Sequence, residues 1–457
     1  MQVFNRYVST RSLTAFAAEL LLISGSVALA AALQDAPGQA ANLWKVGLVT
    51  IVCQLCLYYN DFYDLTLVQS NRELIVRLLQ AAGAASILLA ALYLAIPALM
   101  IGDGIFVSAL FVFLVGIFGW RLMFNSVTRS FHFEERVLVV GTGEAARKVT
   151  RQILDQKDFA YRVVGFIDDD PHRIGERIVN PGVIGTPADI PRLIAEHQVD
   201  RIIVGLPDRR GKFPTNELLQ AKLSGVRVED VTTTYERVTG KILIDDLRPS
   251  WLIFSDGFRV SRLTRWMKRA IDVALSVLLG VVTAPLMALT AIAVALESGF
   301  PVLYCQERVG EHGRTFTLRK FRSMRLDAEK EGTPVWASSD DDRVTRIGRF
   351  IRLTRLDELP QLWNVLRGDM SFVGPRPERP FFVSELSKAI PFYQQRQVVK
   401  PGITGWAQVR YRYGASIEDA TEKLRYDLYY IKHLSIFFDL TIVFDTVKVV
   451  LFRKGAA

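Results

Sequence analysis

The chain has 457 residues, of which half are hydrophobic, and a formal net charge of +9 from 56 basic and 47 acidic residues. This length allows two or three domains, each with its own core. The basic excess suits anionic partners such as phospholipid headgroups or phosphorylated substrates. Only three cysteines are present, which excludes a disulfide framework or a cysteine-rich zinc cluster, and we expect a protein facing the reducing cytoplasm.

Four apolar runs fill the first 125 residues: Leu13 to Leu33, Leu43 to Tyr59, Leu78 to Met100 and Ile105 to Phe118. Each approaches the ~20 residues that a helix needs to cross the hydrocarbon of a bilayer. The arginines that flank these runs fall on one side of such a bundle, and only Lys45 falls on the other. The positive-inside rule therefore predicts a domain of four membrane spans at 1–125 with both ends in the cytoplasm.

Residues 126–246 change to an alternating α/β pattern. The segments Arg136–Val140, Val163–Ile167 and Arg201–Val204 are short and apolar, as buried strands are, and helical stretches separate them. Strands and helices that alternate at this spacing predict a parallel, doubly wound sheet and hence a Rossmann-like domain.

The first of these strands runs into a glycine-rich turn that contains Gly141 and Gly143, and Asp168 ends the second strand. A glycine turn between a strand and a helix, followed by an acid after the next strand, is the pattern of a dinucleotide-binding fingerprint. One such turn alone is a weak signal. We therefore keep two hypotheses for this domain, a nucleotide site at these three residues and a scaffold or regulatory module.

A fifth apolar run, Val273 to Leu296, carries no charge and contains Pro285 near its middle. Basic residues flank it on both sides, so both flanks are expected in the cytoplasm. A central proline removes a hydrogen bond and bends a helix. These features favour a broken, re-entrant helix at 267–298 that enters the membrane and returns on the same side, with an ordinary fifth span as the alternative.

The region 247–265, which contains Pro249, is predicted to be a linker, and 266–457 a mostly α-helical catalytic domain that includes the re-entrant helix. The chain ends in a largely apolar segment, Ser435 to Phe452, whose charges make a membrane span costly. An interfacial helix is the favoured interpretation of that segment.

Arginine recurs at every third residue from Arg343 to Arg355, directly before the acids Asp357 and Glu358. Pro360 suits the first turn of a helix, which predicts a helix from about Glu358 with Asp357 at or beside its N-cap, ending at Gly368.

Capping is the common role of such an acid, and arginine runs are commonly solvated faces. The combination nevertheless suits phosphate oxygens, and the positive surroundings should keep Asp357 ionised, as a nucleophile must be. Adjacent helical carboxylates point roughly 100° apart. One of the two acids could therefore attack phosphorus while the other holds a divalent cation such as Mg²⁺.

Further cations occupy stiff or turn-rich stretches. Three prolines surround Arg376 and Arg379, and a rigid backbone under an arginine favours bidentate phosphate binding. Lys320 and Arg322 add two more candidate phosphate ligands. Taken alone, each of these stretches has a turn as its default interpretation.

Four motifs in one order resemble the bacterial sugar transferase family, whose members are monotopic polyprenyl-phosphate glycosyl-1-phosphate transferases. They are Lys-Phe-Arg-Ser-Met (320–324), Leu-Asp-Glu-Leu-Pro-Gln-Leu-Trp-Asn-Val-Leu (356–366), Gly-Asp-Met-Ser-Phe-Val-Gly-Pro-Arg-Pro-Glu (368–378) and Lys-Pro-Gly-Ile-Thr-Gly-Trp-Ala-Gln-Val (400–409). The preceding spans and α/β domain resemble the large subclass, which includes undecaprenyl-phosphate glucose and galactose phosphotransferases. The segment 247–257 is similar to members associated with exopolysaccharide export.

The resemblance implies that Asp357 is the nucleophile, that Glu358 helps to bind Mg²⁺, and that Arg352 and Arg376 hold phosphates. Pro285 corresponds to the proline that breaks the re-entrant helix of the family. The residue before that proline is often Ser in the family and is Ala284 here, which leaves the geometry of the break open.

The implied reaction transfers a sugar-1-phosphate from a UDP-sugar to undecaprenyl phosphate, releasing UMP, by a ping-pong mechanism with an aspartyl-phosphosugar intermediate. This would be the first membrane step of exopolysaccharide or glycoconjugate assembly. The implied partners are the UDP-sugar, undecaprenyl phosphate, membrane lipids and a second copy in a homodimer, with no nucleic acid. The implied location is the bacterial inner membrane, multi-pass, with the soluble domains in the cytoplasm.

Two other classes of protein are alternatives to a sugar-1-phosphate transferase. A membrane-bound nucleotide-sugar dehydratase or epimerase could share the spans and the Rossmann-like domain, but it needs a Tyr-x-x-x-Lys pair. None of the 14 tyrosines is followed by lysine four residues later. A non-enzymatic membrane receptor is the second alternative, and it would not depend on Asp357.

Overall fold

The computed structural model of the chain describes residues 2–3, 6–7, 10–33, 43–63, 70–101, 105–130, 134–155, 161–206, 213–245, 255, 257–326, 328, 341–411, 414 and 416–452. The chain forms two compact units, one from Tyr7 to Thr234 and the other from Tyr235 onward, and residues 2–6 belong to the second unit. Part of the predicted linker at 247–265, residues 247–254 and 256, lies outside the described residues, and its last four residues already belong to the helix that begins at Arg262.

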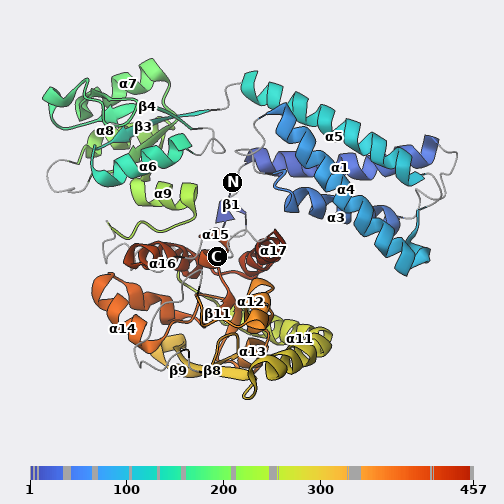
Figure 1. Cartoon of the computed structure of the whole chain (residues 1–457). Coiled ribbons are helices and arrows are strands. Elements are labelled where there is room, and N and C mark those ends of the chain that lie inside the picture. The colour runs from blue at the N-terminus through green and yellow to red at the C-terminus, as the bar shows by residue number, and fades with distance from the viewer. Residues whose placement is uncertain are drawn as a thin grey trace. The chain divides into compact units, whose positions relative to one another are not determined.

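The first unit begins with a bundle of four helices, each of which coincides with one of the four predicted apolar runs (Figure 1). They are α1 (Thr10–Leu33), α3 (Leu43–Tyr59), α4 (Asn71–Ala95) and α5 (Ile105–Ser130), after the short strands β1 (Gln2–Val3) and β2 (Arg6–Tyr7), and η1 (Pro97–Leu99) follows α4. By length and composition, α1, α4 and α5 could cross a membrane, whereas α3 is apolar with 17 residues.

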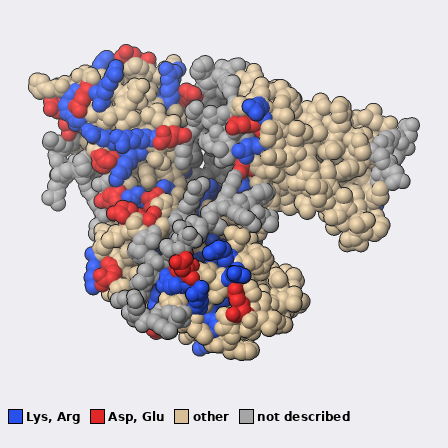
Figure 2. Space-filling view, in the orientation of Figure 1, with Lys and Arg blue, Asp and Glu red and all other residues tan. Residues whose placement is uncertain are grey.

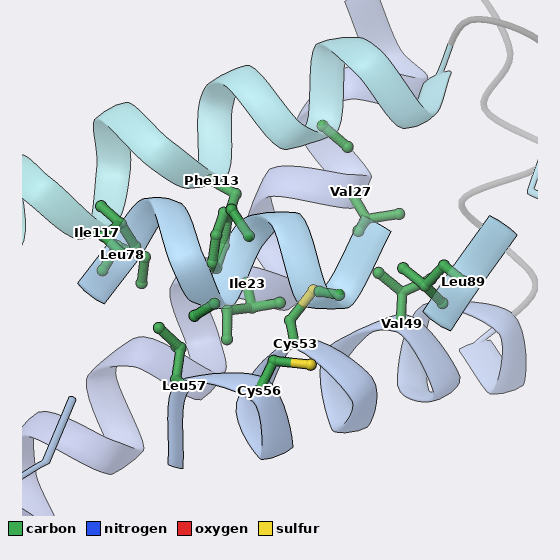
Figure 3. Packing of buried hydrophobic residues seen from close by; sticks show 14 of the residues in the cluster. Ile23, Val27, Val49, Cys53, Cys56, Leu57, Leu78, Leu89, Phe113 and Ile117 are labelled. Atoms are coloured by element: carbon green, nitrogen blue, oxygen red, sulfur yellow. The ribbon is translucent and has the colours of Figure 1, made fainter. Parts of the chain in front are cut away.

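The bundle is apolar both inside and outside. Its core interlocks Ile23 and Val27 of α1 with Cys53 and Leu57 of α3 and with Phe113 of α5 (Figure 3). On the face seen in Figure 2 the outer surface of the bundle is almost uncharged, and its few charged side chains gather at one end. Helices that are hydrophobic all round belong in a membrane, so the structure supports a membrane domain here.

One ion pair is buried inside this apolar bundle. Arg121 Nε of α5 lies 2.6 Å from Glu19 Oε1 of α1, and both side chains are fully buried. The guanidinium of Arg121 also sits 4.6 Å from the ring centroid of Phe62. An unpaired charge at this position would be strongly unfavourable, so the pair accounts for the acid inside the first apolar run.

The α/β domain has a five-stranded sheet in the order β5-β4-β3-β6-β7, with every neighbouring pair parallel. Counted along the chain this is the order 3-2-1-4-5 of a doubly wound fold, so the predicted Rossmann-like architecture is confirmed. The strands are β3 (Glu135–Val140), β4 (Tyr161–Ile167), β5 (Val183–Gly185), β6 (Arg201–Val204) and β7 (Arg227–Asp230). The helices are α6 (Glu144–Asp155), α7 (Ile190–His197), α8 (Thr215–Leu223) and α9 (Val231–Thr239), with the short turns η3 (Pro171–Arg173) and η4 (Pro187–Asp189).

The second unit is mostly helical, as predicted, and contains two small sheets within its described residues. β8 (Leu303–Val309) and β9 (Thr315–Phe321) form an antiparallel hairpin around η5 (Glu311–Gly313), and β10 (Ser371–Val373) pairs in parallel with β11 (Gly402–Thr404). Its helices are α11 (Arg262–Ser298), α12 (Arg346–Leu353), η6 (Leu356–Glu358), α13 (Gln361–Arg367), α14 (Pro380–Ala389), η7 (Tyr393–Val398), α15 (Trp406–Arg410), α16 (Ile417–Lys432) and α17 (Ile436–Phe452).

The core of this unit is aromatic. Trp406 stacks on Tyr429 of α16 at a centroid distance of 6.2 Å and meets Phe438 of α17 edge-on at 5.1 Å. The indole nitrogen of Trp406 donates to the carbonyl of Gly240 at 2.9 Å, so the residue that follows α9 is tied into the same core. The tryptophan of the Lys-Pro-Gly-Ile-Thr-Gly-Trp motif therefore serves packing.

α11 is one continuous helix through Pro285, so the predicted break of the helix at that residue is not observed, and both of its ends dock on other elements of the second unit. Near its start, Arg269 donates to the carbonyls of Val365 and Leu366 at 2.5 and 2.7 Å. Near its end, Glu297 accepts hydrogen bonds from the backbone N–H groups of Arg346 and Ile347 at 2.9 and 3.0 Å.

The middle of α11 carries exposed apolar side chains on both sides of Pro285, among them Val281, Val282, Leu289 and Ile292. The length and composition of this helix would allow it to cross a membrane. The hydroxyl of Thr283 donates to the carbonyl of Leu279 at 2.6 Å, so a hydroxyl that bonds the backbone lies one residue before Ala284.

The C-terminal segment forms α17 in the position predicted for an interfacial helix. Asp439 and Asp445 are buried toward the unit, and Phe437, Leu440 and Phe444 are exposed. Lys268 of α11 pairs with Asp439 at 2.6 Å. The charges that argued against a membrane span thus fall on the packed face, while apolar side chains occupy the outer face.

Glycines of two motifs hold β10 and β11 together. A Cβ atom on Gly402 would overlap the backbone nitrogen of Gly374 and the carbonyl oxygen of Thr404, and one on Gly405 would overlap the carbonyl oxygen of Gly374. Only glycine allows backbones to approach this closely. The two motifs are therefore a single structural feature, although about thirty residues separate them in the chain.

We predict that Gly402→Ala destabilises the protein by roughly 1–3 kcal/mol, because the new methyl group meets rigid backbone atoms. The measurement is the thermal unfolding midpoint in detergent. Gly280→Ala in α11 is the matched control, since no atom lies within 4 Å of its added Cβ, and its midpoint should be unchanged or higher. Equal midpoints for Gly402→Ala and wild type would contradict the close backbone approach.

Candidate active site

Asp357 and Glu358 lie on η6, a single 3-10 turn between α12 and α13. Arg355, with φ of 60°, reverses the chain after α12, and α13 begins only at Gln361. The prediction of a helix from Glu358 with Asp357 as its cap is therefore wrong, because the left-handed Arg355 starts a separate turn first. The predicted end is confirmed, since Gly368 caps α13 with φ of 96°.

Glu358 is buried and surrounded by cations. Its Oε1 lies 3.2 Å from Lys320 Nζ, 3.1 Å from Arg376 Nη2 and 3.8 Å from Arg355 Nη1. Burial opposes ionisation of Glu358, but the three cations outweigh it and hold the pKa of Glu358 well below its usual value. The ionised form of Glu358 is therefore favoured, and its contacts hold together β9, η6 and the turn containing Arg376.

Asp357 is also buried, yet its Oδ1 has no hydrogen-bond partner among the described residues. Burial raises the pKa of Asp357; Lys320 lowers it, and the neighbouring Glu358 raises it. We expected the surrounding cations to favour the ionised form, but the net shift of the Asp357 pKa is upward because burial, together with the charge of Glu358, outweighs the effect of the cations. A carboxylate with an unpartnered oxygen and little hydration is a good oxygen nucleophile once it is deprotonated.

Lys320 links the two acids electrostatically. Burial lowers the pKa of the Lys320 ammonium, and the charge of Glu358 raises it. Lys320 is on β9, where the hairpin register sets it opposite Tyr304 of β8. The hairpin therefore delivers this cation to the acids on η6.

The other predicted phosphate ligands lie in different places. Arg352 on α12 donates from Nε to Ser323 Oγ at 2.8 Å, and its charge also acts on Asp341. Arg379 is the half-buried N-cap residue of α14, away from the contacts of Glu358.

Arg322 serves the backbone. Its Nη2 donates to the carbonyls of Ser298 and Gly299 at 2.7 and 2.6 Å and so caps the end of α11. The structure thus brings Lys320 and Arg376 to the acids and assigns Arg322 to the end of the α11 helix.

Sequence reasoning left Arg355 out of the site. Arg355 is the last arginine of the run in which arginine recurs at every third residue. Its position two residues before Asp357 was the feature of the sequence that could have placed it in the site. Its left-handed backbone turns its side chain toward Glu358, and helical periodicity could not have predicted this orientation.

Asp357 and Glu358 are the candidate ligands for a bound Mg²⁺. Within the described residues no cluster of three or more His, Cys, Asp or Glu side chains gathers as a metal site. Mg²⁺ in phosphoryl-transfer sites is commonly held by one or two carboxylates, with substrate phosphates and water completing the shell. Two adjacent carboxylates, one with a buried oxygen that lacks a partner, fit that donor set.

The glycine turn of the α/β domain has the geometry of a dinucleotide-binding fingerprint, but side chains of the same domain already bind Asp168, the acid of that fingerprint. Gly141 has φ of 102°, and an added Cβ would lie 2.8 Å from the carbonyl oxygen of Gly205; Gly143 then leads into α6. Asp168 Oδ2 accepts hydrogen bonds from Thr142 Oγ1 and, at 2.7 Å, from Arg173 Nη1. The carboxylate that binds a ribose in such folds is here engaged by protein side chains.

Comparisons with known proteins agree with this division of the chain. Residues 263–453 match the family described as bacterial sugar transferase, and residues 59–213 match one described as CoA-binding domain. The chain is 41% identical over 239 residues to a UDP-N-acetylgalactosamine-undecaprenyl-phosphate N-acetylgalactosaminephosphotransferase of Aeromonas hydrophila, covering 52% of this chain and 56% of that protein. It is 35% identical to an undecaprenyl-phosphate glucose phosphotransferase of Komagataeibacter xylinus, covering 73% of this chain and 62% of the relative.

A third relative is the UDP-glucose:undecaprenyl-phosphate glucose-1-phosphate transferase of Xanthomonas campestris pv. campestris, 33% identical over 70% of this chain and 68% of that protein. The chain belongs to the bacterial sugar transferase family. It spans less than two thirds of the length of the first two relatives, 56% and 62%.

Proposed function

We propose that this protein transfers a sugar-1-phosphate from a UDP-sugar to undecaprenyl phosphate, releasing UMP and giving undecaprenyl-diphosphate-sugar. The relatives carry names for reactions of this type with glucose and N-acetylgalactosamine. The observation that carries the proposal is the buried Asp357, whose Oδ1 has no hydrogen-bond partner in the part of the chain that the structure describes and which adjoins an acid neutralised by Lys320, Arg355 and Arg376. Such a site attracts a diphosphate and presents a nucleophile to it.

In the first half-reaction, a carboxylate oxygen of Asp357 attacks the β-phosphorus of the UDP-sugar. A bond forms between that oxygen and phosphorus, the bond from phosphorus to the bridging oxygen breaks, and UMP leaves with the bridging oxygen. Arg352 and Arg376 hold phosphate oxygens and balance the charge that shifts toward the leaving group. The sugar-phosphate remains on Asp357.

In the second half-reaction, a phosphate oxygen of undecaprenyl phosphate attacks the same phosphorus. The bond to Asp357 breaks, the carboxylate is regenerated, and the lipid leaves as a diphosphate-sugar. Glu358 would hold Mg²⁺ together with phosphate oxygens, and the ion would supply charge neutralisation.

The acceptor is a lipid, so the site needs access to the membrane surface. We propose that α11 is re-entrant, bending near Pro285, because both of its ends dock on the second unit while its apolar middle is exposed. A straight helix of this length would extend ~55 Å, more than the ~30 Å of hydrocarbon requires. The α/β domain and the second unit then share the cytoplasmic side of the inner membrane, where UDP-sugars are made, and we propose a homodimer as the assembly.

We predict that Asp357→Asn lowers UMP release by at least about a thousandfold, because the amide cannot form the phosphosugar adduct. Purified protein is incubated with Mg²⁺, undecaprenyl phosphate and a panel of UDP-sugars, and adducts are sought by mass spectrometry of the intact chain. Glu385→Gln on α14, an exposed acid, is the control and should keep wild-type rates. Full activity of Asp357→Asn would remove this residue from the mechanism.

We also predict that Lys320→Met moves the acidic limb of kcat/KM toward higher pH. Lys320 is the strongest of the cations that lower the pKa of Asp357, so removing its charge raises that pKa further. Because the ionised form attacks, a higher pKa leaves less of it at a given acidic pH. Lys388→Met, which removes an exposed cation on α14, should leave the limb in place. An unmoved limb in Lys320→Met would argue against Asp357 as the titrating group.

Single cysteines test the membrane orientation, after the three native cysteines are replaced. Maleimide reagents that cannot cross the membrane should label cysteines at Arg265, in the first turn of α11, and at Arg314, beyond the end of α11, only from the cytoplasmic side. Labelling of the two positions from opposite sides would make α11 a membrane span, and the site would then be separated from UDP-sugars.

A further inference from the structure

The turn that carries Arg376 is held by an unusual set of contacts. Its four successive carbonyl groups, of Pro375, Arg376, Pro377 and Glu378, each accept a hydrogen bond, and the donors come from three segments of the chain. The donors are Gly402 N at 2.9 Å, Arg396 Nη2 at 2.9 Å, Arg308 Nη1 at 3.1 Å and Val309 N at 2.9 Å. Prolines 375 and 377 have no N–H, so this turn depends on its acceptors.

The donor to the Arg376 carbonyl is itself fixed by a buried network. Arg396 Nη2 lies 2.8 Å from Asp427 Oδ2 of α16, and Arg396 Nη1 donates to Tyr393 Oη at 2.7 Å. All three side chains are more than nine-tenths buried. One guanidinium nitrogen therefore stands between the Asp427 carboxylate and the backbone of Arg376.

The charge state of Asp427 supports an ionic pair at neutral pH. Burial raises the pKa of Asp427 to about 6, while Arg396 opposes this rise. Glu378 and Lys423 are the other charged groups that act on it, with opposite signs. The carboxylate is thus predominantly ionised at pH 7, where an isolated buried guanidinium would otherwise lack a counter-charge.

We propose that Asp427 and Arg396 are positioning residues that hold Arg376 in place at Glu358 for the reaction. Neither side chain contacts Asp357 or Glu358 in the described structure; both act through the Arg376 backbone, whose side chain reaches Glu358 Oε1 at 3.1 Å. This role rests on the proposed function, because Arg376 matters only if it binds a phosphate. A displacement of a phosphate ligand by about 1 Å can reduce turnover by about a hundredfold.

The test uses the full chain with Asp427→Asn, which keeps the shape of the side chain and removes its charge. We expect kcat for UMP release to fall at least about tenfold, with a smaller change in KM. The thermal midpoint is measured alongside. Glu418→Gln, an exposed acid on the same helix, is the matched control and should leave kcat unchanged.

A double variant separates positioning from general structural damage. In an Arg376→Ala background the further change Asp427→Asn should cost no more activity, since the arginine to be positioned is gone. An additive loss would overturn the proposal, as would full activity of Asp427→Asn in the wild-type background. If Asp427→Asn folds poorly, Arg396→Lys is the second variant. It keeps the buried positive charge but loses the planar guanidinium that reaches both Asp427 and the Arg376 carbonyl.

Hydrogen exchange gives a readout without any substrate. The amides of Val309 and Gly402 bond the carbonyls of Glu378 and Pro375, and their exchange should speed up in Asp427→Asn while the control exchanges as wild type. Unchanged exchange would overturn the proposal. If wild type releases no UMP from any UDP-sugar, the proposed function fails, and the exchange data still decide whether the pair positions the turn.

Discussion

Two carboxylates side by side in a buried site can persist only where cations compensate at least one of them. Glu358 receives that compensation from Lys320, Arg355 and Arg376, which come from a hairpin, from the turn before η6 and from the proline-rich turn. The requirement draws three separate segments to one point. It also leaves Asp357 as a buried acid whose Oδ1 has no hydrogen-bond partner among the described residues, and the proposed nucleophilic role rests on this feature.

Other contacts of the second unit hold the segments around Asp357 and Glu358 in place. Glycines 374, 402 and 405 let two motifs share one narrow backbone contact, and the buried Arg396–Asp427 pair anchors the turn between them. α11 docks on the same framework by Arg269 and Glu297 while exposing its apolar middle. The same framework thereby holds the two acids and a helix whose exposed apolar side chains suit lipid, which is what the proposed reaction between a soluble donor and a lipid acceptor requires.

The first unit combines a membrane bundle with a parallel α/β domain. In that domain, side chains of the protein itself bind the acid that follows the glycine turn. Thr142 and Arg173 engage Asp168, so the acid of the fingerprint contributes to internal structure. Glu144, the first residue of α6, further places negative charge where a phosphate would approach the helix. These contacts favour the scaffold hypothesis over a nucleotide site for this domain.

The sequence by itself determined the four bundle helices, the parallel sheet, the long apolar helix and the acids at 357 and 358, because apolar periodicity and motif order are local properties of a chain. Only the tertiary structure decided which cations serve those acids. Arg322 lies two residues from Lys320, yet Arg322 caps α11 and Lys320 binds Glu358, because β9 ends at Phe321 and Arg322 lies beyond the strand. The upward pKa shift of Asp357 and the Arg396–Asp427 pair likewise depend on burial among segments far apart in the chain, which no local pattern records.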